Sequence, residues 1–301
     1  GESYGALRAA GLLKYLYETH GMEFEGLLLI SPALDLDTIL FSSTNDLPYV
    51  LFFPSYTAAA WYHGKIAPEL RDSLPLAIAE AEEWAIEEYL PALARGDLLP
   101  EAERDRLAEQ FARFTGLPEK LVSKWNLRVS REDFTSELLR SEGLSIGFMD
   151  GRRVQSGMDE ASFLHDPGMA ATYGPYSGAI NEYLSNQLGF TPGIPYVTFS
   201  RQVNSQWNWG SAVGQADAVE TIRNALNRNK RLKILAAAGY FDLDVPYFAT
   251  TYVISHLRAD PRLHENISVS FFRGGHMFYT SNEALESFSR EAAVFFKKLQ
   301  Y

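Results

Sequence analysis

The apolar positions near the start of the chain change period between two short segments. Between Ala6 and His20 the leucines recur close to a helical spacing, and Gly21 stands where a helix C′ residue belongs. The segment Gly26–Ile30 is instead apolar at every position and is followed by Ser31 and Pro32. This pattern predicts a helix followed by a short strand that is buried on both faces.

The middle of the chain, from Tyr56 to about Leu144, is rich in Ala, Glu, Leu and Arg and predicts helices without strands. Apolar residues at helical spacing indicate an amphipathic helix over residues 76–90 and another over 101–114. Ser130, with Asp133 three residues later, resembles a capping box at the start of a further helix. Just before this region, the apolar run Tyr49–Phe53 has the length of a strand.

Residues 146–215 hold many Gly, Pro, Tyr, Asn and Ser residues, and we expect irregular structure there with one helix over 178–188. Beyond it, helices and strands alternate, with helices expected over 216–227, 246–257 and 281–299 and strands over 232–238 and 267–272. Such alternation at both ends of a chain predicts a parallel sheet with helices on its faces. We therefore expect an α/β core made of residues 1–50 and 216–301, with residues 51–215 inserted as a mainly helical cap.

Composition and charge narrow the classes of function. With 46% apolar and 13% aromatic residues, the 301-residue chain has ample material for a core. Its 27 basic and 38 acidic residues give a net charge of −11, which argues against a nucleic-acid or anionic-membrane partner. The absence of cysteine excludes a disulfide scaffold, a thiolate metal site and a cysteine nucleophile. No apolar run has the roughly 18 residues that a membrane span needs, and we expect neither a metal nor a cofactor.

The chain opens with Gly1-Glu2-Ser3-Tyr4-Gly5, which matches the G-x-S-x-G nucleophile elbow. The two glycines of this pattern are expected to clear a tight turn between a strand and a helix. The turn would hold the Ser3 hydroxyl at a helix N-terminus and leave the backbone N–H of Tyr4 available to an oxyanion. The predicted helix and strand that follow are the context that this motif requires.

A carboxylate follows the strand predicted over 232–238, in the sequence Gly239-Tyr240-Phe241-Asp242. An acid on the turn just past a strand end is where an α/β hydrolase carries the acidic member of its catalytic triad. Asp244 is a competitor two residues later. We prefer Asp242, because the Gly-x-x-Asp spacing places it at the crest of the turn, and we expect Asp244 to cap the helix that begins at Pro246.

A histidine follows the next predicted strand, in the sequence Gly274-Gly275-His276-Met277. The glycines are expected to let this loop bend back over the sheet edge. Ser3, Asp242 and His276 then occur in the chain order of the α/β-hydrolase triad, in which His acts as base toward Ser and Asp orients the imidazole. The 239-residue separation of Ser3 and Asp242 is accounted for by the inserted cap.

These three motifs together resemble the serine carboxypeptidases of the carboxypeptidase Y and cathepsin A type, and most closely their bacterial branch. The resemblance implies an α/β-hydrolase fold and release of the C-terminal amino acid of a peptide through an acyl-enzyme. It implies that Glu2 helps to hold the carboxylate of the substrate, which fits activity at acidic pH because one of two carboxyl groups sharing a hydrogen bond is protonated. It also implies that Met277 lies beside the leaving-group pocket, that no cofactor is used, and that the protein is exported.

The family also carries a long portion before the elbow, which supplies most strands of the sheet and the second oxyanion N–H. We therefore expect this chain to be the C-terminal part of a larger enzyme, or to need a partner chain, and we expect residues 26–30 to form an exposed sheet edge. Two alternatives stay open. One is an esterase or acyltransferase with the same triad, and the other is a non-catalytic fragment or binding piece.

Overall fold

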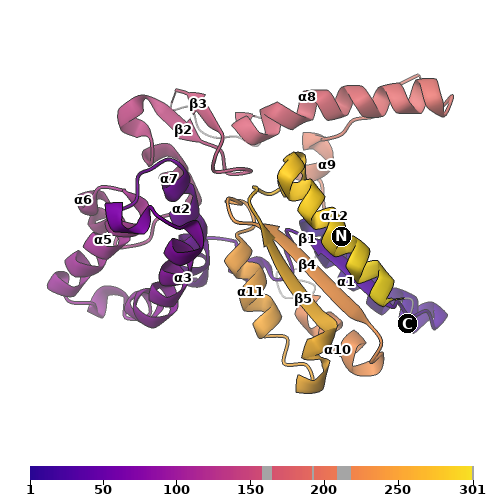
Figure 1. The fold of residues 1–301 in the computed structure, drawn as a ribbon, viewed down its shortest axis with the longest axis horizontal. Helices are drawn as coiled ribbons and strands as arrows, with labels where there is room; N and C mark the ends of the chain where they lie inside the picture. Colours follow the sequence, from indigo (N-terminus) through magenta and orange to yellow (C-terminus); the bar gives the residue numbers. More distant parts are fainter. Residues whose placement is uncertain (158–164, 192, 209–217, 300–301) are drawn as a thin grey trace.

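The computed structural model describes residues 1–157, 165–191, 193–208 and 218–299, and within them the chain is a mixed α/β protein (Figure 1). Its main sheet is parallel and has the strand order β1 (Gly26–Ile30), β4 (Lys233–Gly239) and β5 (Ile267–Phe272). The sheet predicted from the alternation of strands and helices is therefore present. Because all three strands are parallel, their carboxyl ends meet at one edge of the sheet.

Helices cover both faces of this sheet (Figure 1). Alternate side chains of β4 point to opposite sides, so Ile234 and Ala236 pack with one group of helices while Ala237 packs on the side of the last helix. The first group is α1 (Tyr4–His20), α10 (Ala218–Arg228) and α11 (Tyr247–Ser255), and the last helix is α12 (Asn282–Lys298). These ranges confirm the predicted helices, although residues 216 and 217 lie outside the described residues.

The first strand differs in two ways from its prediction. Only Leu27 and Leu29 of β1 are buried, whereas its other residues are partly exposed, so β1 is better covered on one face than on the other. Its outer edge is not bare either. The amino group of Gly1 donates to Leu28 O at 2.7 Å, and Ser3 N donates to Ile30 O at 2.9 Å. Residues 1–3 therefore run alongside the end of β1.

Residues 47–137 form the helical part of the molecule, at the left of Figure 1. Its helices are α2 (Leu47–Tyr62), α3 (Leu74–Trp84), the π-helical turn η3 (Ala85–Tyr89), α4 (Leu90–Leu93), α5 (Glu101–Thr115), α6 (Glu119–Lys124) and α7 (Arg131–Glu137). The predicted 76–90 helix is thus interrupted by a π turn. The capping box is confirmed, since Asp133 N donates to Ser130 Oγ at 3.1 Å and Ser130 N donates to Asp133 Oδ2 at 3.2 Å.

The apolar run Tyr49–Phe53, which has the length of a strand, lies instead in helix α2. Helix α2 is surrounded on several sides, because α3 and α5 pack against it within the helical part and α11 packs against it from the sheet. A helix enclosed in this way is apolar all round and shows no amphipathic period. Its residue Phe53 packs against Trp84 and Phe111, with ring centroids 4.8 and 4.9 Å apart.

The segment expected to be irregular contains more regular structure than predicted. A short antiparallel hairpin joins β2 (Leu144–Ile146) to β3 (Val154–Ser156). Helix α8 (Pro167–Glu182) begins well before residue 178, because Asp166 caps it by accepting from Gly168 N at 2.8 Å and Met169 N at 3.1 Å. It continues into the π turn η7 (Tyr183–Gln187), and α9 (Arg201–Ser205) follows. Figure 1 shows the end of α8 projecting away from the sheet.

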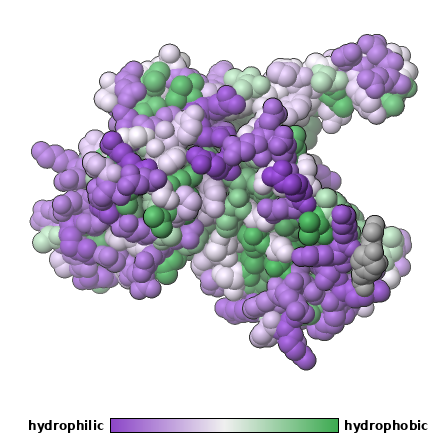
Figure 2. Space-filling view, viewed as in Figure 1, coloured by the Kyte–Doolittle hydropathy of each residue, from purple (hydrophilic) through white to green (hydrophobic). Residues whose placement is uncertain are grey.

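Short 3₁₀ helices connect the larger elements, namely η1 (Leu36–Thr38), η2 (Pro68–Leu70), η4 (Gly96–Leu98), η5 (Arg140–Glu142), η8 (Pro261–Asn266) and η9 (Phe278–Thr280). The cap boundary expected at residue 215 falls within 209–217, outside the described residues. Figure 2 shows apolar residues on the surface over the region of β5 and α11, where Val269 of β5 is partly exposed.

Candidate active site

Ser3 lies at a sharp turn between the residues beside β1 and helix α1. Its backbone has φ 54° and ψ −128°, a conformation that L-residues rarely adopt. A Cβ at Gly1 would lie 2.4 Å from Gly5 O, so the turn requires glycine at this position. A Cβ at Gly5 would meet no atom within 4 Å. The steric requirement that the motif predicts therefore holds for Gly1 and not for Gly5.

Asp242 follows β4 on a tight turn and is fully buried. Its Oδ1 accepts hydrogen bonds from Asp244 N and Val245 N, each at 2.8 Å, and its Oδ2 lies 2.8 Å from His276 Nδ1. The backbone donors fix the carboxylate so that one oxygen stays directed at the imidazole. Asp244 does not cap the next helix, whose N-cap is Pro246, and instead pairs with Arg131 at 2.7 Å.

His276 lies on the loop after β5, which is held against the Asp242 loop through glycines. A Cβ at Gly239 would lie 2.2 Å from Gly275 O and 2.3 Å from Gly274 O, so only glycine permits this approach. Two further bonds position the histidine backbone. His276 N donates to Met149 O at 2.7 Å, and Ser31 Oγ donates to His276 O at 2.8 Å.

The buried Asp242–His276 pair shifts the titration of both groups. Burial alone lowers the pKa of His276, but the negative charge of Asp242 and its hydrogen bond raise that pKa to about 9. Burial raises the pKa of Asp242, and the charge of His276 acts against that shift. The pair thus favours a charged imidazolium over a neutral imidazole.

Ser3 and His276 line one cavity of about 380 Å³. Among the described residues no hydrogen bond joins the Ser3 hydroxyl to the imidazole, which is common for a catalytic pair without substrate. Asp244, the competitor of Asp242, also lines this cavity. The other walls are mainly apolar or aromatic and come from the segment after β2, from α8 and from residues 198–199: Met149, Met169, Thr172, Tyr173, Tyr176, Thr198 and Phe199.

Two of the remaining predicted residues, Glu2 and Met277, line the same cavity, and Tyr4 is not part of the lining that the structure describes. Glu2 Oε1 accepts a hydrogen bond from Tyr279 OH at 2.8 Å. Burial, with the charge of Glu2, raises the pKa of Tyr279, so this phenol stays a donor. Tyr4 is the first residue of α1, and its hydroxyl accepts from Trp207 Nε1 at 3.1 Å. Ser3, Glu2, Asp242, His276 and Met277 are thus brought together.

Sequence reasoning missed Ser31, Met149, Asp166 and Tyr279. Asp166 is buried and accepts from Phe148 N at 2.6 Å, so it holds the segment whose next carbonyl receives His276 N. Local signals were available. Ser31 directly follows a predicted strand, and Tyr279 lies three residues after the candidate base. Asp166 followed by Pro167 was also a local sign of a helix start. The contacts of Asp166 with Phe148 and of Met149 with His276 gave no local sign, because they depend on how the chain folds back.

Within the described ranges, no group of three His, Asp or Glu side chains could hold a metal ion. No helix in the described part of the chain is both long and apolar enough to cross a membrane. Comparison of the chain with models of protein families, with curated proteins and with solved structures found no match in any of the three.

Proposed function

We propose that this protein is a serine hydrolase of the α/β-hydrolase fold and acts as a serine-type carboxypeptidase. The observation that carries the proposal is the 2.8 Å hydrogen bond between Asp242 and His276, at the carboxyl ends of neighbouring parallel strands, beside a cavity that Ser3 shares. Ligands of open α/β sheets bind at this edge. The strained backbone of Ser3 is further support, since the elbow of such enzymes is strained in the same way.

In the proposed reaction, Ser3 Oγ attacks the carbonyl carbon of the last peptide bond while its proton passes to His276 Nε2. The Tyr4 N–H stabilises the negative oxygen that forms. His276 then gives the proton to the departing nitrogen, the C–N bond breaks, and a free amino acid leaves an acyl-Ser3 ester. Water, deprotonated by His276, hydrolyses this ester and releases the shortened peptide.

Glu2 distinguishes a carboxypeptidase from an esterase with the same triad. It lines the cavity beside Ser3, and its bond from Tyr279 holds it in place. We propose that Glu2 shares a proton with the free carboxylate of the substrate. Glu2→Gln should then shift the pH profile for peptides and leave esters without a carboxylate unaffected. An unchanged peptide profile at every pH would favour the esterase.

The first test is hydrolysis of N-acylated dipeptides by the native protein and by Ser3→Ala. We expect Ser3→Ala to lower kcat by at least about 10³-fold and to abolish labelling by a fluorophosphonate. Ser255→Ala, on the exposed end of α11, is the matched control and should retain full activity. Equal activity of Ser3→Ala and the native protein would overturn the proposal.

The raised pKa of His276 opposes the acidic preference that the resemblance implies, because a protonated imidazole cannot accept the proton of Ser3. The titration of His276 affects every substrate, whereas the proton shared with Glu2 matters only for a peptide with a free carboxylate. With an ester that lacks a carboxylate, kcat/KM should rise with pH toward about 9. With a peptide, loss of the proton shared with Glu2 should add a falling limb on the alkaline side.

A further inference from the structure

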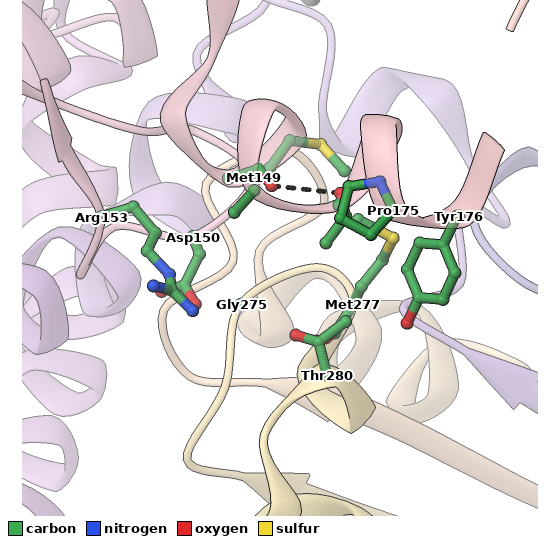
Figure 3. Close-up of a pocket in the computed structure, with 11 residues that line it drawn as sticks. Met149, Asp150, Arg153, Pro175, Tyr176, Gly275, Met277 and Thr280 are labelled. Atoms are coloured by element: carbon green, nitrogen blue, oxygen red, sulfur yellow. Dashed lines mark hydrogen bonds between the residues drawn. The ribbon is translucent and has the colours of Figure 1, made fainter. Parts of the chain in front are cut away.

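A second cavity, of about 330 Å³, adjoins the one that holds Ser3 and His276. The two cavities share walls, which are Met149, Thr172, Tyr176 and Met277. Figure 3 shows Arg153 beside Asp150 at one side of this second cavity and Tyr176 of α8 at the other. The space therefore lies beyond Met277, next to the candidate base.

In the described part of the chain, the two charged residues that line this second cavity are Asp150 and Arg153. The carboxylate of Asp150 is already occupied by Arg152, whose Nε lies 2.9 Å from Oδ1 and whose Nη2 lies 2.7 Å from Oδ2. Arg152 also donates to Arg273 O at 2.9 Å, so it is committed to the wall. Arg153 lines the cavity and makes no ion pair with any carboxylate of the described residues. Arg152 thus neutralises Asp150, and the positive charge of Arg153 is left without an ion-pair partner among the described residues.

The position of this cavity relative to the triad indicates which part of a substrate would enter it. In the proposed reaction His276 delivers its proton to the departing nitrogen, so the leaving amino acid lies on the side of the His276 loop. Gly275, Met277 and Thr280 of that loop and its continuation line the second cavity, whereas the candidate nucleophile Ser3 does not. Its occupant is therefore expected on the leaving side.

We propose that this second cavity binds the acidic side chain of the leaving residue, and that Arg153 selects substrates that end in Asp or Glu. The inference rests on the proposed function. A guanidinium suits this task because its planar donors match a carboxylate in a bidentate geometry. Arg153 is exposed, and solvent weakens its attraction for a carboxylate. We therefore expect kcat/KM to be about five- to tenfold higher for an acidic leaving residue than for its amide.

The test compares four N-acylated dipeptides that share the first residue and end in Glu, Gln, Lys or Leu. The native protein should show the highest kcat/KM for Glu, about five- to tenfold above Gln. Arg153→Gln should remove this difference, Arg153→Lys should keep part of it, and Arg153→Glu should favour the Lys peptide. Arg231→Gln, on the distant turn before β4, is the matched control and should keep the native order.

Two kinetic outcomes would overturn the inference while the proposed function stands. One is equal kcat/KM for Glu and Gln in the native protein. The other is an equal loss for all four peptides in Arg153→Gln, which would assign Arg153 to the α-carboxylate instead of the side chain.

Calorimetry that measures binding of the same peptides to Ser3→Ala separates this inference from the proposed function. Suppose that the Glu peptide binds Ser3→Ala more tightly than the others and loses this advantage when Arg153→Gln is added, while the native protein hydrolyses none of the four peptides. That result would support the anionic subsite and overturn the peptidase. If Ser3→Ala binds none of the peptides and the native protein hydrolyses none of them, both this inference and the proposed function are overturned.

Discussion

At the scale of the residue, the backbone of Ser3 departs from what local preference would select. A φ of 54° with ψ −128° is unfavourable for serine, and residues held in this way cost on the order of 1–3 kcal/mol. The turn is maintained by neighbours, since Ser3 N donates to Ile30 O and Ser3 O accepts from Ala33 N at 3.2 Å. Strain at a candidate nucleophile is expected where the position of its hydroxyl has been selected over stability.

This strain predicts that Ser3→Gly is more stable than Ser3→Ala, by about 1 kcal/mol in the free energy of unfolding. Glycine adopts this turn without a steric cost, whereas alanine has a Cβ and retains the steric cost. Chemical denaturation of the two variants measures the difference. At Ser281, where φ is −90°, the order should reverse, and the same order at both positions would contradict the explanation.

The Asp242–His276 pair predicts how stability depends on pH. The pKa of His276 is about 9 in the folded protein, above its ordinary unfolded value near 6.5. The imidazolium therefore stabilises the fold fully below about pH 6.5, and this contribution is lost as pH rises through about 9. Denaturation at several pH values should show a loss of a few kcal/mol across this window.

Asp242→Asn should flatten that dependence, because it removes the charge that raises the pKa of His276. An asparagine side-chain oxygen can still accept the hydrogen bonds from the backbone N–H groups of Asp244 and Val245, so the turn itself is preserved. His20→Gln, at the exposed end of α1, should leave the dependence unchanged. An equal slope in Asp242→Asn and the native protein would refute the assigned coupling.

At the scale of the element, the candidate site depends on the close packing of the loops after β4 and β5. Gly239 ends β4 against the carbonyls of Gly274 and Gly275, and Phe241 N donates to Gly274 O at 2.9 Å. The separation of Asp242 and His276 is set by this contact. The glycines in the sequence thus indicate a close backbone approach, although they do not indicate which segment approaches which.

We expect Gly239→Ala to lower the free energy of unfolding by about 2 kcal/mol or more, since the new methyl group would overlap two backbone oxygens. Because the loops must separate, activity should fall as well. The control is Gly11→Ala in α1, where a Cβ meets nothing within 4 Å, and it should be stabilising by up to about 1 kcal/mol. Similar thermal midpoints for the two variants would contradict this account.

At the scale of the whole molecule, the helical part meets the sheet part through the segment that follows β2. Leu243 N donates to Phe148 O and Gly151 N donates to Phe241 O, each at 2.9 Å. The ion pair of Arg131 with Asp244 joins α7 to the turn that carries Asp242. The two parts are therefore linked at the candidate site, so the position of the helical part and the geometry of the candidate site should vary together.

A double-mutant cycle of Arg131→Ala and Asp244→Ala should give a coupling of about 1 kcal/mol in the free energy of unfolding, since both side chains are partly buried. The exposed Arg106–Glu88 pair lies within the helical part and should couple more weakly. Hydrolysis by the single variants gives a second readout. A coupling no larger than that of the control pair would show that the ion pair does not join the two parts.

Most of the elements and the composition of the candidate triad could be predicted, because both are written in neighbouring residues. The helix that ends at His20, the strand that ends at Ile30 and the capping box at Ser130 depend on local period and local hydrogen bonds. The early start of α8 at Pro167 was missed because its Gly and Pro residues obscure the period.

The sequence by itself determined the order Ser3, Asp242 and His276 and the strand ends that carry the last two, since these follow from short motifs. Only the tertiary structure decided that residues 49–53 are helical, that Asp244 pairs with Arg131, and that His276 is held by Ser31. Each of these depends on groups far apart in the chain, and Ser31 and His276 are 245 positions apart. Burial and partner choice at such distances are set by the packing of the whole chain, which no local pattern records.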